Sequence, residues 1–269
     1  MFLTDTHCHL DKEYYPDGLD AVFKNALDND VKRVLFVGSL NYSGESVRVA
    51  NGENALEVWA GVGVHPHEAA SMPDGIIPEI RQLAADKKVV AVGEIGLDYF
   101  YDISPRDIQR KVFREQIEFA REIKKPVVVH VRDAKEKSGG DANADNIRIL
   151  REAHAEDCGG VIHCFSGNEQ DAYNALDLGF YISFAGPLTF KRNTELREIA
   201  AKLPMDRLLC ETDSPYLAPE PFRGRTNEPC HVKQVYELLA MLREMTIEEL
   251  SEKIDENGCR LFGWGSENV

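Results

Sequence analysis

The sequence predicts an α/β protein, a single-domain (β/α)8 barrel that takes in residues 1–269. Short runs of β-branched residues alternate with longer amphipathic stretches along the whole chain, in eight pairs, which is typical of parallel strands joined by helices. In addition, residues of the kinds that bind metal ions follow several predicted strands, where barrels of this class place their active sites. An open, doubly wound parallel sheet is the alternative that the same rhythm allows.

Eight short runs rich in valine, isoleucine and leucine are the predicted strands. They cover residues 2–6, 31–37, 56–62, 89–92, 126–129, 160–162, 179–184 and 207–210. Apolar residues recur at helical spacing in 108–123, and Pro126 follows, so we expect a helix that ends before this proline. Polar residues and glycines in 135–146 predict a loop. Residues 247–262 are predicted to form a C-terminal helix that closes the barrel.

Composition and charge narrow the class of protein. Hydrophobic residues make up 43% and charged residues 29% of the chain, which excludes a disordered protein, collagen and a coiled coil. The net charge of −15 argues against a protein that coats duplex DNA, but it is compatible with a local phosphate site. No apolar run is long enough for a membrane span, so we expect a cytoplasmic protein with no membrane contact. The sequence also gives no sign of an obligate protein partner. The six cysteines are expected to be reduced thiols.

Six histidine and carboxylate residues at the ends of predicted strands are the candidate metal ligands. They are His7, His9, Glu94, His130, His163 and Asp213. His7 and His9 stand two apart at the end of the first strand, so both imidazoles lie on one face. Asp5 shares that face and is predicted either to support the ligands or to accept a hydrogen bond in the core. Because the carboxyl ends of all barrel strands meet at one mouth, we expect the six side chains to converge.

The donor types predict two divalent metal ions, with Mg²⁺, Mn²⁺ and Zn²⁺ all acceptable to imidazole and carboxylate ligands. Six donors are too many for one tetrahedral zinc, but they suit two ions about 3.5 to 4 Å apart when a carboxylate bridges them. Glu94 is the predicted bridge. The first ion is predicted to be held by His7, His9 and Asp213, and the second by His130 and His163. Asp213 and Glu94 are the predicted catalytic residues, with Asp213 orienting an activated water or accepting its proton.

Seven motifs, in order, resemble those of the TatD-type metal-dependent deoxyribonucleases among the amidohydrolase-like barrels. They are DTHCHLD (5–11), GVHPH (63–67), GEIGLDY (93–99), HVRDA (130–134), HCFSG (163–167), ETDSPYL (211–217) and NEP (227–229). The resemblance spans residues 2–264 and implies a TIM barrel with the same six metal ligands. It also implies single-stranded DNA ends as substrate and a link to DNA repair. Val131 departs from the family pattern, as do Cys230 and His231 after NEP, and these positions leave the substrate contacts open.

Five further residues are predicted to contact the substrate. They are His65, Arg132, Arg223, Arg225 and Asn227. His65 lies in a glycine-flanked loop after the third strand, and arginine binds phosphate oxygens through its bidentate fork. Each has an ordinary alternative: a loop histidine bonded to backbone, an ion pair of Arg132 with Asp133 or Asp98, or a solvated surface charge. The role of His67 in the same loop stays open.

Aromatic residues also flank the ligand motifs, namely Tyr99, Phe100, Tyr101, Phe165 and Tyr216. Such rings can stack on nucleobases, although most aromatic side chains in loops over a barrel mouth pack against the protein.

The predicted function is hydrolysis of DNA phosphodiester bonds, as an exonuclease on single-stranded ends. One alternative uses the same metal centre on the ester of D-aminoacyl-tRNA, or on a small amide or lactone, and the acidic composition favours it. A second alternative is an inactive metal-binding interaction protein, against which the complete ligand set argues. The sequence contains no P-loop, dinucleotide-binding glycine motif or nucleophile elbow.

Overall fold

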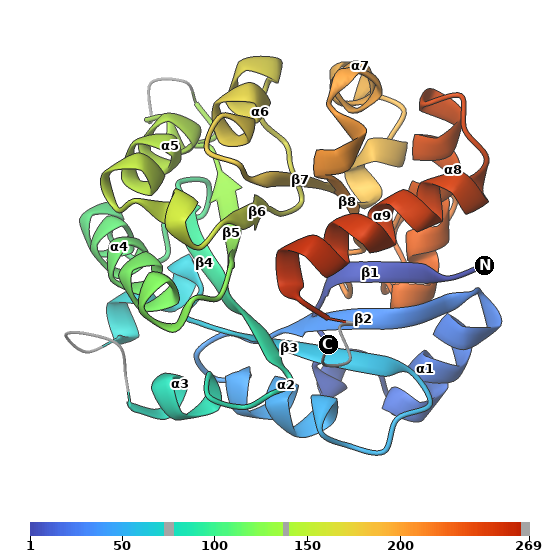
Figure 1. The fold of residues 1–269 in the computed structure, drawn as a ribbon, viewed down its shortest axis with the longest axis horizontal. Coiled ribbons are helices and arrows are strands. Elements are labelled where there is room, and N and C mark those ends of the chain that lie inside the picture. The colour runs from blue at the N-terminus through green and yellow to red at the C-terminus, as the bar shows by residue number, and fades with distance from the viewer. Residues whose placement is uncertain (73–77, 137–139, 265–269) are drawn as a thin grey trace.

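Eight parallel strands form one sheet in which each strand pairs with the next along the chain (Figure 1). The structure is a computed structural model that describes residues 1–72, 78–136 and 140–264. The strands are β1 (Leu3–Cys8), β2 (Val31–Val37), β3 (Glu57–Val62), β4 (Val89–Asp98), β5 (Val127–Arg132), β6 (Gly160–Ile162), β7 (Tyr181–Phe184) and β8 (Leu208–Cys210). A parallel bridge between Cys8 and Ser214 joins the two ends of the sheet. The predicted (β/α)8 TIM barrel is therefore confirmed, and the open sheet is excluded.

Helices surround the strands and cover their outer faces (Figure 1). They are α1 (Leu19–Asp28), α2 (Ser43–Ala50), α3 (Pro78–Leu83), α4 (Arg106–Ile123), α5 (Ala142–Glu152), α6 (Glu169–Leu176), α7 (Thr194–Lys202), α8 (Val232–Leu242) and α9 (Ile247–Phe262). The helix predicted over 108–123 is α4, and Lys124 ends it in the left-handed conformation before Pro126. Strand and helix side chains pack into a continuous apolar core. No helix among the described residues is long and apolar enough to cross a membrane.

Strand β4 is longer than the sequence predicts. It continues past Val92 to Asp98, through a register shift against β5 between Val92 and Ile95. Gly96 makes this possible, because its φ of 141° and its closeness to β5 leave no room for a side chain: a Cβ there would lie 2.0 Å from the carbonyl oxygen of His130. The extension places Glu94 inside the strand rather than after it.

The loop predicted over 135–146 is shorter than expected. Residues 137–139 lie outside the described residues, and α5 already begins at Ala142. The Asp141 side chain accepts a hydrogen bond from the N–H of Ala144 (2.7 Å), and Asp133 accepts one from the N–H of Ala142 (2.7 Å). These two carboxylates cap the first turn, which explains a helix start in a polar stretch.

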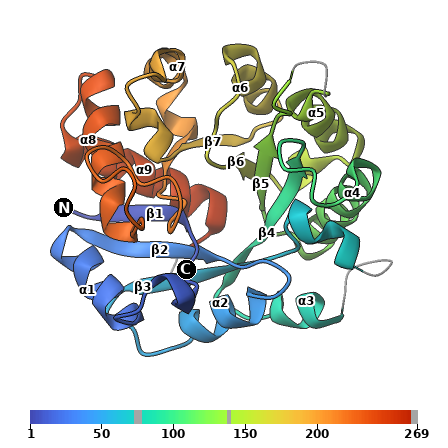
Figure 2. The same ribbon diagram turned by 180° about the vertical axis from the view of Figure 1, so that it is seen from behind.

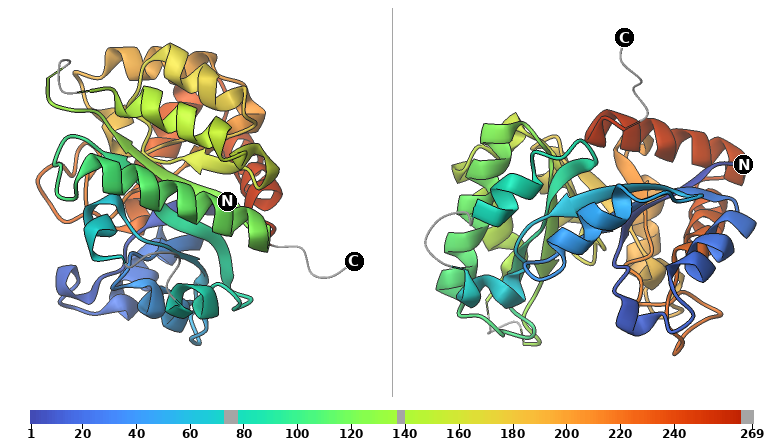
Figure 3. Two further views of the ribbon diagram at one scale, coloured as in Figure 1. Left: turned by 90° about the vertical axis from the view of Figure 1, so that its left-hand side faces the viewer. Right: turned by 90° about the horizontal axis from the view of Figure 1, so that it is seen from below.

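Helix α9 closes the amino-terminal end of the barrel, as the sequence predicts (Figure 1; Figure 3, right). The amide of Asn257 donates to the carbonyl oxygens of Met205 and Leu208 at the start of β8. Asp255 pairs with Arg33 near the start of β2. The six cysteines, all among the described residues, are free.

The opposite end of the barrel, seen in front in Figure 2, carries the segments that follow the strands. The long connection between β8 and α8 lies at this end. We call this end of the barrel the mouth, and the predicted site residues lie there.

Candidate metal centre

Glu94 lies at the centre of a cluster of histidines and carboxylates at the mouth. The residue is 3% exposed, and its two carboxylate oxygens face different histidines. Glu94 Oε1 lies 2.9 Å from His130 Nδ1 and 2.8 Å from His163 Nε2. Glu94 Oε2 lies 3.4 Å from His7 Nε2 and 3.3 Å from His9 Nε2. One carboxylate therefore stands between two groups of donor atoms.

The first group consists of His7, His9 and Asp213. His7 is the penultimate residue of β1 and His9 follows the strand, and their Nε2 atoms lie 3.2 Å apart. Asp213 Oδ1 is 3.8 Å from His7 Nε2 and 3.7 Å from His9 Nε2. His9 Nδ1 donates to the carbonyl oxygen of Val37 (2.9 Å), which turns its other nitrogen toward the cluster.

The second group consists of His130 in β5 and His163 after β6. Each has one ring nitrogen facing Glu94 and the other facing a second carboxylate. His130 Nε2 donates to Asp98 Oδ2 (3.1 Å), and His163 Nδ1 donates to Glu211 Oε1 (3.1 Å). Such outer carboxylates fix the tautomer and orientation of ligating histidines.

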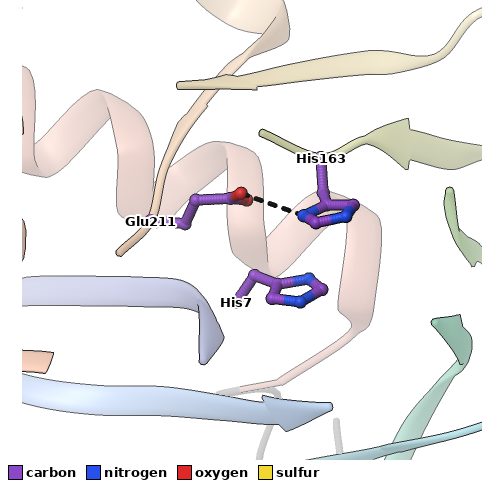
Figure 4. Close-up of side chains that lie close together, drawn as sticks. All are labelled: His7, His163 and Glu211. Atoms are coloured by element: carbon purple, nitrogen blue, oxygen red, sulfur yellow. Dashed lines mark hydrogen bonds and ion pairs between the residues drawn. The ribbon is translucent and has the colours of Figure 1, made fainter. Parts of the chain in front are cut away.

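The two groups touch through stacked rings. The His7 and His163 rings lie 3.9 Å apart and nearly parallel, and Figure 4 shows the carboxylate of Glu211, which directly follows β8, reaching the ring of His163. Side chains from β1, β6 and the end of β8 therefore meet within one small volume.

The donor atoms fit divalent metal ions. Combinations of His7, His9 and Glu94, of His65, Glu94 and His130, and of His7, His163 and Glu211 each bring ligand atoms within 4.8 Å of one another. Two Nε2 atoms that face each other at 3.2 Å can share at most one proton in a hydrogen bond, so they are better suited to a common cation. His7 Nδ1 and Glu211 Oε2 are buried and have no hydrogen-bond partner among the described residues. Imidazole and carboxylate donors without thiolates suit Zn²⁺, Mn²⁺ or Mg²⁺.

The electrostatics distinguish the two catalytic candidates. Burial raises the pKa of Glu94, but the nearby His163 and His65 outweigh it and hold that pKa well below its usual range. Burial raises the pKa of Asp213 to about 6, and His163 and His9 offset this only in part. In the metal-free centre Glu94 therefore favours the ionised form, whereas the protonated form of Asp213 is less disfavoured.

The pKa values of the histidines at the centre also differ from one another. Burial lowers the pKa of His7 to about 4 and that of His65 to about 4. For His163, burial also opposes the charged form, but Glu94 and Glu211 raise its pKa well above the usual value. The pKa of His9 rises to about 9, because its contact with Glu94 outweighs burial.

Two carboxylates that lie at this centre, Asp98 and Glu211, were not predicted from the sequence as site residues. Asp98 Oδ2 faces both His130 and His67, the latter at 2.9 Å. Glu211 accepts from the backbone N–H of Cys164 (2.7 Å) as well as from His163. Asp98 stands four residues after Glu94 on the extended β4, so the period of two that linked His7 and His9 could have found it. Asp5, by contrast, bonds the backbone and side chain of Thr212 rather than an imidazole ring.

The predicted substrate residues lie in different settings. His65 Nε2 is 3.5 Å from Glu94 Oε1, inside the cluster. Arg132 has no ion pair among the described residues, and its guanidinium lies over the rings of Phe100 and Tyr101 instead of pairing with Asp133 or Asp98. Arg223 and Arg225 are exposed in the segment after β8.

Asn227 is fully buried. Its amide donates to the carbonyl oxygens of Thr212 (3.0 Å) and Tyr216 (2.7 Å), so it holds the segment that carries Asp213. Among the predicted aromatics, Tyr99 and Phe165 are each 3% exposed and pack inside, whereas Tyr101 and Tyr216 are exposed.

Comparison with known proteins identifies the family. The family model described as "TatD related DNase" matches residues 4–263. The chain belongs to the TatD family. A TatD relative, the uncharacterized metal-dependent hydrolase YabD of Bacillus subtilis, is 42% identical over 97% of this chain and 98% of its own length. The 3'-5' ssDNA/RNA exonuclease TatD of Pantoea vagans is 33% identical over 96% of this chain and 98% of its own length.

Solved structures agree with this assignment to the TatD family. The crystal structure of YJJV, a TatD homolog from Escherichia coli, superposes with a TM-score of 0.86 at 29% identity, and covers 97% of this chain and 98% of that one. A TatD family hydrolase from Entamoeba histolytica, at 23% identity and a TM-score of 0.82, shares the fold over 97% of each chain. The protein is therefore a metal-dependent hydrolase of the TatD family, with histidine, glutamate and aspartate groups able to bind metal ions.

Proposed function

We propose that this hydrolase cleaves phosphodiester bonds of DNA at single-stranded ends, with two divalent metal ions. The observation that carries the proposal is the position of Glu94, whose two oxygens face two separate histidine groups. A carboxylate in that position suits a bridge between two ions. The exonuclease name of the Pantoea vagans relative supports the substrate class.

Each proposed ion has its own ligands. His7, His9, Asp213 and Glu94 Oε2 would hold the first ion, and His130, His163 and Glu94 Oε1 the second. Bound there, the ions would polarise the phosphoryl group, lower the pKa of a water molecule and stabilise the developing charge. Asp98 and Glu211 keep the ligating nitrogens of His130 and His163 turned toward Glu94.

Asp213 is the proposed general base. It is 13% exposed in its side chain, so it borders the open side of the centre, where a carboxylate can accept a proton from water. The Asp213 carboxylate orients the attacking water and takes its proton. His65, beside Glu94 and 16% exposed, is placed to donate a hydrogen bond to a phosphate oxygen.

The test is digestion of end-labelled single-stranded DNA by metal-stripped protein that is resupplied separately with Mg²⁺, Mn²⁺ or Zn²⁺. We expect stepwise shortening from one end only when an ion is present. An Asp213→Asn variant should lose this activity, and a Glu57→Gln variant at the closed end of the barrel should keep it, because Glu57 contacts Arg33 rather than the cluster.

Intact DNA in every lane would overturn the proposal. Hydrolysis of D-aminoacyl-tRNA by the same preparations would then assign the centre to ester substrates, a result that the net charge of −15 would make understandable.

A further inference from the structure

Exposed aromatic rings gather at two places on the mouth. The first, here called the Tyr216 platform, consists of Tyr14 after β1 and Tyr216 after β8, which are 37% and 47% exposed. Their rings lie 5.9 Å apart in an edge arrangement, with the two hydroxyls 3.5 Å apart. The Tyr216 ring is 6.0 Å from the ring of His9. This platform therefore borders the first group of metal-binding candidates.

The second place, here called the Phe100 platform, consists of Phe100 and Tyr101, which follow β4 and the buried Tyr99. Their ring centroids are 5.0 Å apart, and Tyr101 is 54% exposed. The Tyr101 ring lies 5.5 Å from His67, which shares the Asp98 carboxylate with His130. This platform therefore borders the second group.

The two platforms stand on opposite sides of the mouth. In the order β1 to β8 around a closed barrel, β4 lies across from β8. A series of ring contacts runs between the platforms: His9 to His7 (4.9 Å), His7 to His163 (3.9 Å) and His163 to His130 (5.6 Å). The proposed metal centre thus lies between two exposed aromatic surfaces.

Both platforms are held in place by the residues of the centre itself. Asp98 Oδ1 accepts from the backbone N–H groups of Phe100 (3.0 Å) and Tyr101 (2.8 Å), while its other oxygen faces His130. On the other side, the N–H of Tyr216 donates to the carbonyl oxygen of Asp213 (3.0 Å). The distance from each platform to the proposed ions is therefore fixed by the backbone.

The platforms differ in charge. Arg132 lies 4.1 Å over the Phe100 ring, and the Lys135 ammonium lies 4.7 Å from the same ring. On the other side Tyr14 follows the exposed Glu13, and the nearby Lys12 is paired with Glu45 at 3.3 Å. Phosphate groups are therefore attracted to the Phe100 platform.

We propose that the two platforms stack the nucleobases on either side of the scissile phosphate, with the terminal base on the Tyr216 platform and the next base on the Phe100 platform. The inference rests on the proposed nuclease function. Every base has a ring face, so stacking holds a single strand without choosing its sequence. The phosphates of the remaining DNA then run past the positively charged side chains of Arg132 and Lys135.

The test is binding of a fluorescent phosphorothioate oligothymidylate, which resists hydrolysis, to the metal-supplied protein, followed by fluorescence anisotropy. Tyr216→Ala and Tyr101→Ala should each weaken binding by about 5- to 150-fold, the range for loss of one stacked base. Tyr216→Trp and Tyr101→Trp should restore it. Tyr173→Ala is the matched control, because Tyr173 is 40% exposed on the outer helix α6.

Strands that lack one base identify which platform holds which nucleotide. Loss of the terminal base should weaken binding to the normal protein and have little further effect on Tyr216→Ala. Loss of the next base should behave in the same way with Tyr101→Ala. Equal binding by all variants of a protein that does digest DNA would overturn the platforms and leave the nuclease proposal standing. A protein that neither binds nor digests the strand would overturn both.

Discussion

The two ends of the barrel contain buried charge in opposite arrangements. At the end closed by α9, Arg33 is 6% exposed and is matched by the carboxylates of Glu57 and Asp255, with the ring of Trp264 5.4 Å away. At the mouth, Glu94 faces the imidazole nitrogens of His7, His9, His130 and His163. Asp213 lies beside His9. One end pairs its buried charges within the protein, and the other directs several donor atoms at a common point.

The end closed by α9 therefore stabilises the fold, whereas the mouth is arranged to bind a ligand. A buried cation with paired carboxylates and apolar packing around it serves the fold, since removing one partner leaves a charge unpaired. Donor atoms of several residues that converge on one point serve a ligand. Substitutions at the two ends should therefore change different measured quantities.

Among the substitutions, the largest effect is expected for Glu94→Gln. The substitution keeps the shape of the side chain but removes the charge between the two histidine groups, so turnover should fall by about 1,000-fold or more. Circular dichroism should show an intact fold. Turnover is measured on labelled single-stranded DNA with saturating metal. Near-normal turnover after exhaustive purification would show that the centre does not depend on a bridging carboxylate.

At the closed end, Trp264→Ala should have the opposite signature. Trp264 is 1% exposed, and its ring packs 4.4 Å from that of Phe262, so the free energy of unfolding should fall by about 3–5 kcal/mol. Turnover of the folded protein should not change. Urea titration at a temperature well below melting measures the loss. Trp264→Phe is the control and should lose much less, because it keeps an aromatic ring in the same position.

Metal removal should affect both quantities, but by different routes. Chelation should abolish turnover, and an ion resupplied at 100 times its dissociation constant should stabilise the fold by about 2.7 kcal/mol. Thermal melting with and without the ion measures this. If the ion stabilises the Trp264→Ala variant by the same free energy, the two ends of the barrel act independently. A melting temperature that does not respond to any divalent ion would argue against the proposed ligand set.

The smallest effect is expected for Glu211→Gln. Glutamine can still accept the N–H of Cys164 but no longer offers a charged partner to His163. Metal affinity or turnover should fall by about 10- to 100-fold. Competition with a colorimetric chelator gives the affinity directly. Asp255→Asn, at the closed end, should leave the affinity unchanged, and an equal drop in both variants would mean a general loss of structure.

The sequence predicts the barrel and the residues that meet at its mouth because both follow from local patterns. The alternation of strand and helix patterns predicts the fold. The period of two of side chains along a strand predicts that His7 and His9 lie on one face. The ends of parallel strands meet at one edge, so residues such as His163 could be placed without knowing their partners.

The contacts that the sequence could not predict all depend on approach between distant strands. Glu211 reaches His163, 48 positions earlier in the chain, only because β6 and β8 bring the two together. Asp98 was not placed because the predicted strand over 89–92 ends before it, whereas Gly96 lets β4 pass close to β5 and continue to Asp98. Whether an amide faces substrate or backbone, as with the buried Asn227, is likewise decided by tertiary packing.

The contacts between the first strand and the segment after the last strand have a consequence for synthesis on the ribosome. Asp5 accepts a hydrogen bond from the N–H of Thr212, 207 positions further along the chain. A growing chain therefore presents His7 and His9 long before Asp213 exists. With the proposed ligands, a nascent or truncated chain holds only a fraction of the centre, so the complete metal site forms only after the last strand has closed the ring.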